Sequence, residues 1–125
     1  MKLRIRDDSL RLRLGQAEVS RIARGEAVEG CMHLPGGNAF RYRLEGASDA
    51  TVDVVGDGSG LTVRVAADAL DDWARDDTVS LALRCADDGA RLDVLIEKDF
   101  ACLTARDGDD DADSFPHPEA GNSTC

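Results

Sequence analysis

Three residues near the C-terminus have the chemistry of a metal site: Cys102, His117 and Cys125, with several aspartates nearby. Two thiolates, an imidazole and a carboxylate or water would satisfy tetrahedral Zn²⁺, and thiolates also attract Cu(I). The spacing matches no zinc-finger or zinc-ribbon pattern. In the alternative interpretation, Cys102 packs as a small apolar side chain. The sequence therefore leaves zinc, copper and no cofactor open.

Two of the remaining cysteines lie in segments expected to be strands. Cys31 and His33 are two positions apart, so both side chains point to one face and form one edge of a metal site, which two ligands alone do not complete. Cys85 falls at an inward strand position, and we expect it in the core. The N-terminus has no apolar signal region and no stretch is long enough to span a membrane, so we expect a cytoplasmic protein with reduced cysteines or thiolate ligands.

Basic side chains alternate with apolar ones along the first two expected strands. Since alternate residues of a strand share a face, they form one contiguous basic patch. The patch consists of Lys2, Arg4, Arg6, Arg11 and Arg13. Three uses compete for it: nucleic acid, an acidic protein partner, and the chain's own acidic stretch at 109–113. A solvated basic face without a partner is the fourth interpretation.

Motifs of enzymes are missing from the sequence. There is no nucleophile elbow, phosphate-binding loop, dinucleotide fingerprint or zinc-protease helix motif. His117 is a potential base for Cys102, but the sequence around Cys102 contains nothing that would activate its thiol. We therefore expect a protein that is not an enzyme.

Charge is divided unevenly along the 125 residues, whose formal net charge is −10. Residues 1–24 hold 7 basic and 3 acidic groups, and the rest of the chain holds 8 basic and 22 acidic groups. Neutralisation of phosphates supplies most non-specific affinity for nucleic acid, so nucleic acid is not the expected partner of the whole chain. The length fits one domain with a core that needs no disulfide or metal.

Hydrophobic periodicity predicts a mainly β chain with two short helices. The expected strands are 2–6, 9–14, 27–34, 39–45, 51–55, 60–65, 78–85 and 92–96, and the expected helices are 16–24 and 67–74. Clusters of glycine, aspartate and asparagine between them predict tight turns.

Residues 9–29 align with residues 60–80 at an offset of 51 without a gap, and 5 of the 21 positions are identical. The alignment predicts two ββαββ repeats, about 1–46 and 51–98. Strands this short favour closure, so we expect a small pseudo-two-fold β-barrel over 1–98. Residues 99–125 would be an acidic tail packed on the barrel or extending from it. Uncapped sheet edges allow a homodimer.

The second copy resembles the cradle-loop barrels, which include the AbrB-type regulators and the double-psi barrels. The resemblance rests on Gly60–Val65, on the helix with Leu70 and Trp73, and on the segment Asp77–Leu81. Ala66 stands where these proteins often have proline. The resemblance implies a barrel fold and implies little about function, because the group contains DNA-binding proteins, enzyme subdomains and adaptors.

The whole chain also resembles a family of short uncharacterised bacterial proteins. The similar segments are Met1–Arg6, Ser9–Leu14, Glu97–Leu103 and the acidic run before Phe115 and Pro116. This resemblance implies no activity. It does imply that the tail carries a recurring pattern.

These observations favour a non-catalytic cytoplasmic binding or adaptor protein of unknown partner, with the basic patch and the tail as its surfaces and with a metal clasp on the tail as an option. A DNA-binding regulator that uses the basic hairpin is the first alternative. A thiol-dependent zinc or copper carrier is the second.

Overall fold

A computed structural model describes residues 1–49, 52–87 and 89–99 of the chain. Its elements in chain order are β1 (Lys2–Arg6), β2 (Ser9–Leu14), α1 (Gln16–Ala23), β3 (Val28–His33), β4 (Ala39–Ala47), β5 (Asp53–Asp57), β6 (Gly60–Ala66), α2 (Ala67–Arg75), β7 (Ser80–Asp87) and β8 (Ala90–Lys98). The prediction of a mainly β chain with two short helices is confirmed, and every element lies within two residues of its expected bounds.

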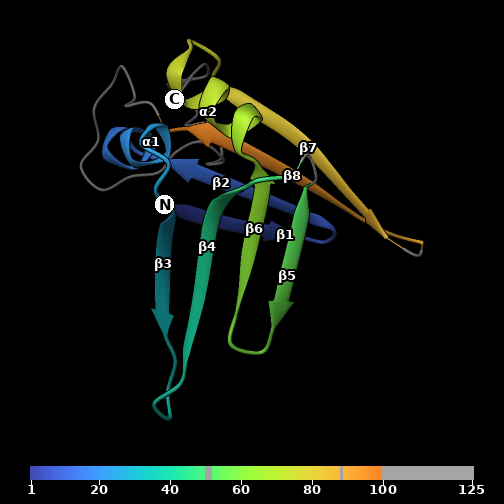
Figure 1. The fold of residues 1–125 in the computed structure, drawn as a ribbon. Coiled ribbons are helices and arrows are strands. Elements are labelled where there is room, and N and C mark those ends of the chain that lie inside the picture. Colours follow the sequence, from blue (N-terminus) through green and yellow to red (C-terminus); the bar gives the residue numbers. More distant parts are fainter. Residues whose placement is uncertain (50–51, 88, 100–125) are drawn as a thin grey trace, which may run out of the picture.

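The strands form two four-stranded sheets. Sheet A has the order β1-β2-β8-β7, and sheet B has the order β3-β4-β6-β5. In each sheet a parallel pair occupies the centre, β2 with β8 in sheet A and β4 with β6 in sheet B. Antiparallel hairpin partners complete both sheets on the outside. Figure 1 shows the strands of one sheet crossing those of the other, with both helices gathered at one end.

The core lies mainly under the central strands and the helices. Alternate side chains of each central strand point inward, as the period-two pattern requires. The largest fully buried side chains are Trp73, Leu12, Leu14, Leu44, Ile96, Val28, Val63, Val65 and Val94. Each such burial stabilises the fold by about 1.5–3 kcal/mol. Apart from Val28 at the start of β3, the edge strands contribute only partly buried apolar residues, including Leu3, Val54 and Leu81.

Hydrogen bonds link the two helices to each other and to the start of β7. Helix α1 ends at a left-handed Gly25, with φ of 81°, and the backbone N–H of Glu26 returns to the carbonyl of Arg21 at 2.9 Å. Arg75 of α2 donates to the carbonyl of Ala23 at 2.6 Å, which links one helix to the other. The Trp73 indole N–H donates to the carbonyl of Val79 at 3.1 Å and so fixes the start of β7.

The prediction of a closed barrel is wrong. Within the described residues, β1 and β7 are the edges of sheet A and β3 and β5 are the edges of sheet B. Inward-facing side chains near these edges stay in solvent, since Ile5 is 58% and Met32 52% exposed. Sequence alternation tells which side chains face inward, but not how many strands surround the core. Here the central strands and helices fill the core without closure of the edges.

Candidate functional site

The predicted basic patch lies on the outer face of the β1–β2 hairpin. Cross-strand pairing places Lys2 opposite Arg13 and Arg4 opposite Arg11, with Arg6 at the turn end of β1. Their neighbours in sequence are leucines and isoleucine that face the core side of sheet A. The five residues therefore share one face, because paired residues and alternate residues of a strand point the same way.

Acidic residues at the end of β8 neutralise one end of this patch. Lys2 Nζ and Arg13 Nη2 each lie 3.0 Å from a carboxylate oxygen of Asp99. Arg11 Nε donates to a carboxylate oxygen of Glu97. Both carboxylates reach the hairpin because β8 runs parallel to β2, with Arg13 paired to Glu97. Their positions in the sequence do not reveal that they meet the patch.

A hollow lies at the other end of the patch. Two rows of paired residues cross all four strands of sheet A there: the first is Arg4, Arg11, Leu95 and Ala82, and the second is Arg6, Ser9, Asp93 and Arg84. Arginines stand on the β1–β2 side of both rows and at the β7 end of the second row, and the other positions carry shorter or apolar side chains. The surface is therefore hollowed, with a volume of about 590 Å³.

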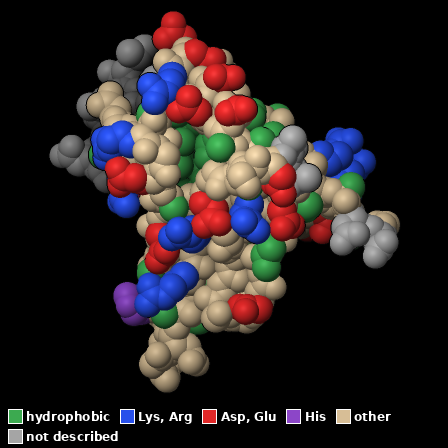
Figure 2. All heavy atoms as spheres, viewed as in Figure 1, with side chains coloured by type: hydrophobic (Ala, Val, Ile, Leu, Met, Phe, Trp, Pro, Cys, Tyr) green, Lys and Arg blue, Asp and Glu red, His purple; other side chains and the backbone are tan. Residues whose placement is uncertain are grey.

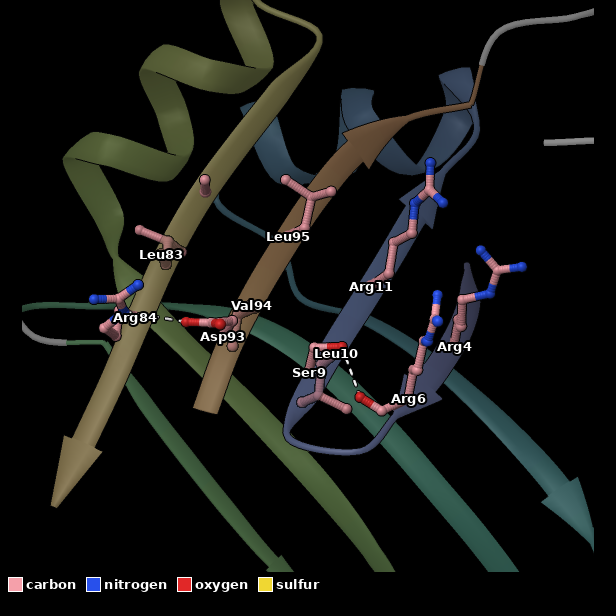
Figure 3. A pocket seen from close by; sticks show the side chains of 11 residues that line it. Arg4, Arg6, Ser9, Leu10, Arg11, Leu83, Arg84, Asp93, Val94 and Leu95 are labelled. Carbon is pink, nitrogen blue, oxygen red and sulfur yellow. Dashed lines mark hydrogen bonds and ion pairs between the residues drawn. The ribbon is translucent and has the colours of Figure 1, made fainter. Parts of the chain in front are cut away.

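Arginine dominates the charge of the hollow. Four guanidinium groups line it, those of Arg4, Arg6, Arg11 and Arg84, and Asp93 is the one acidic residue among the lining residues, while Arg11 is also paired with Glu97 at the margin. Arg84 Nε lies 3.1 Å from Asp93 Oδ1. Figure 3 shows the arginines of β1 and β2 on one side and the Arg84–Asp93 pair on the other. We therefore call this site the basic hollow.

The chemistry of the basic hollow suits anion recognition. A guanidinium presents a planar fork of donors that matches a carboxylate or phosphate group. Leu95 and Ala82 add an apolar surface between the arginines. Ser9 has the only hydroxyl among the lining residues, and this hydroxyl donates to the Arg6 carbonyl at 2.8 Å. The arrangement therefore fits binding of an anionic group that also carries apolar surface.

The outer face of sheet B has a different charge pattern. Glu29, Arg43, Glu45 and Arg64 form a continuous chain of ion pairs, with distances of 3.1, 2.6 and 3.2 Å. Hydrogen bonds to Glu45 and Glu29 raise the pKa of Arg43 further above its usual value. Figure 2 shows basic and acidic side chains side by side across the middle of the visible face. The arginines of sheet B thus already have carboxylate partners within their own face.

A family model described as a family of unknown function, DUF7009, matches residues 1–119. The chain belongs to this family. The prediction of membership in an uncharacterised family is therefore confirmed. No curated protein and no solved structure matches the chain.

The cysteine and histidine predictions have different outcomes in this DUF7009 chain. Cys31 and His33 lie on β3, and both are exposed. Their cross-strand neighbours are Arg41 and Ala39, neither of which is a metal ligand. Cys85 is only partly buried, which corrects its expected place in the core. It lies near the β7–β8 turn, beyond the closely packed centre of the sheet.

Cys102, His117 and Cys125 lie outside the residues that the structure describes, so the metal site of the tail stays a prediction. In the described ranges, 1–49, 52–87 and 89–99, no three histidine, cysteine or acidic side chains gather in a way that could hold a metal ion. Neither helix in these ranges is long and apolar enough to cross a membrane.

Proposed function

We propose that this chain is a non-catalytic binding protein whose basic hollow recognises an acidic segment of a protein partner. The observation that carries the proposal is that four arginines from three strands line one hollow, whose surface between them includes the apolar side chains of Leu95 and Ala82. Carboxylates of the partner would pair with the arginine forks, and an apolar partner side chain would cover Leu95. We thus place the expected adaptor role of the basic patch in the basic hollow, which lies at one end of the patch.

Charge argues for a peptide rather than nucleic acid as the partner. On the outer face of sheet A, seven basic side chains, those of the basic patch with Arg84 and Arg91, stand among the carboxylates of Asp93, Glu97 and Asp99. Proteins that bind DNA commonly neutralise about 6–10 phosphates. The small local excess of positive charge, within a chain of net charge −10, suits a short acidic segment better.

The test is a comparison of two double variants of the full chain. The first variant, Arg6→Glu with Arg84→Glu, reverses the charge on two sides of the basic hollow. The second variant, Arg41→Glu with Arg64→Glu, makes the same change of charge on sheet B. A fluorescein-labelled deca-glutamate peptide, followed by anisotropy at low salt, is expected to bind the first variant at least about tenfold more weakly than the parent. The second variant should bind it within about twofold of the parent.

Equal weakening in both variants would mean that only net charge matters, and the basic hollow would not be a site. A 20-base-pair DNA duplex serves as the competing ligand in the same assay. Tighter binding of the duplex than of the peptide, with a steep salt dependence, would favour the DNA-binding regulator instead.

The proposal extends to the origin of the fold, in which the two halves are copies of one ββαββ unit related by a pseudo-two-fold axis. Support comes from the parallel ladders, in which Arg13 pairs with Glu97 in sheet A and Arg64 pairs with Glu45 in sheet B. The two arginines are 51 positions apart and the two glutamates 52, so the ladders are equivalent once one residue is inserted between the copies' second and fourth strands. Arg13 and Arg64 are also identical partners at the offset of 51. If the halves are copies, the basic hollow is a feature in which the outer face of sheet A differs from the outer face of sheet B.

A further inference from the structure

We infer that the chain's own acidic segment, residues 107–113, occupies the basic hollow and competes there with the acidic partner. This inference rests on the proposed function of the basic hollow. It assigns the site an internal ligand of the same chemistry as the external one. Three observations support it: the place where the described chain ends, the length of chain that follows, and the charge of that segment.

The described chain ends on the face that carries the basic hollow. Asp99 follows β8, and its backbone N–H donates to the carbonyl of Leu14 at 2.8 Å. Its carboxylate lies between Lys2 and Arg13, 3.0 Å from each. The residues after Asp99 therefore start at the edge of the outer face of sheet A, where one carboxylate already binds two basic side chains.

The distance from this point to the basic hollow is short enough for the acidic segment. Asp93, in the second row of the hollow, lies six residues before Asp99, which is about 20 Å along an extended strand. The eight residues 100–107 span up to about 27 Å when extended. Asp107 can therefore reach the basic hollow, and the following aspartates can lie along it.

The segment has the charge that the site requires. Five of its seven residues are aspartates, Asp107, Asp109, Asp110, Asp111 and Asp113, and none is basic. Their carboxylates match the guanidinium forks of Arg4, Arg6 and Arg84. Phe115 follows two positions after Asp113, and its ring is of a size to cover the apolar surface of Leu95 and Ala82. One continuous segment thus supplies both kinds of contact.

Tethering makes such a segment a strong competitor. A ligand attached by a short flexible linker has an effective concentration in the millimolar range. A partner that binds the same arginines must displace it, so its apparent affinity falls by the ratio of that concentration to the segment's own dissociation constant. The acidic segment would therefore raise the affinity that a partner needs in order to bind the hollow. Only a longer or more acidic partner segment would have that affinity.

The experiment uses three forms of the full chain and one probe. The first form is the parent. The second replaces the acidic segment's charges through Asp107→Asn, Asp109→Asn, Asp110→Asn, Asp111→Asn and Asp113→Asn. The third is a control with a comparable change of charge around α2, through Asp68→Asn, Asp71→Asn, Asp72→Asn and Asp77→Asn. The probe is a fluorescein-labelled synthetic peptide of residues 106–116, and far-UV circular dichroism checks that each form is folded.

The dissociation constant of the probe is expected to be at least about tenfold lower for the tail variant than for the parent. The α2 control should resemble the parent. Adding Arg6→Glu and Arg84→Glu to the tail variant should abolish the gain. In ¹⁵N spectra, the tail substitutions should shift the amides of β1, β2 and β7 next to the hollow, and these shifts should not depend on protein concentration.

Two negative outcomes separate the inference from the proposed function. Equal affinity of the probe for parent and tail variant would overturn the internal ligand and leave the basic hollow as a site for acidic segments. Failure of the probe to bind any form would overturn recognition of acidic segments and the internal ligand with it. Spectral shifts that grow with protein concentration would also contradict the inference, since they would place the tail of a second copy in the hollow.

Discussion

Replacement of Leu44 by alanine is expected to destabilise the protein strongly, because Leu44 lies at the centre of sheet B with none of its surface exposed. It is paired with Val28 on one side and Val63 on the other, and both are also fully buried. The substitution removes three carbon atoms from a closely packed region. The neighbouring strands fix its walls, so the resulting cavity cannot fully collapse.

The expected cost is about 3–5 kcal/mol in free energy of unfolding, from the behaviour of buried leucines at sites that relax little. A domain of this size is stable by about 5–15 kcal/mol, so the variant remains folded with a large loss. Met32→Ala is the matched control. Met32 also faces the inner side of sheet B, but it is 52% exposed, and its removal should cost less than about 1 kcal/mol.

Urea denaturation followed by tryptophan fluorescence measures both variants. Trp73 is the one tryptophan of the chain and is 2% exposed, so its emission reports on the loss of the core. The dependence of the unfolding free energy on urea should have the same slope in parent and variants, so that a change of midpoint is a change of stability. Circular dichroism of the same samples tests whether unfolding is two-state.

Two results would refute this reasoning. A cost below about 1.5 kcal/mol for Leu44→Ala would mean that the centre of sheet B is not tightly packed. A cost for Met32→Ala close to that of Leu44→Ala would mean that the far end of the β3–β4 hairpin is covered. The structure of two open sheets would then be incomplete at that edge.

Two further predictions concern the backbone and the response to acid. Gly60→Ala should lower the unfolding midpoint markedly, since an added Cβ would lie 2.1 Å from the Arg41 carbonyl oxygen. Gly58→Ala is the control, because a Cβ there meets nothing within 4 Å and should change the midpoint little. Equal effects of the two substitutions would contradict this prediction. Hydrogen bonds from the Thr78 side chain and N–H hold the pKa of Asp76 below its usual 3.8, so its contribution to stability is present above the unfolded-state pKa and is lost as pH falls through the folded-state pKa. Asp76→Asn should therefore make the thermal midpoint fall less steeply between pH 5 and pH 2, and identical slopes in parent and variant would exclude this role.

Local chemistry in the sequence was enough to predict the elements and the outward position of the basic patch. Leu10, Leu12 and Leu14 alternate with basic residues, and that period of two allows only one choice of inner face. The positive φ of Gly25 likewise follows from the helix pattern that stops before it. Such features depend on neighbours within a few residues, so a single sequence contains them.

The arrangement of the sheets and the surroundings of the basic patch depend on pairing between strands that are far apart in the sequence. The sequence alone did not distinguish a barrel from two sheets, because the same alternation of side chains serves both. It also did not bring Arg84, Glu97 and Asp99 to the basic patch, although their outward positions could be predicted. Only the parallel pairing of β2 with β8 places them there. That pairing is set by how the whole chain fills its core, and so the charge of the basic hollow is a property of the tertiary structure.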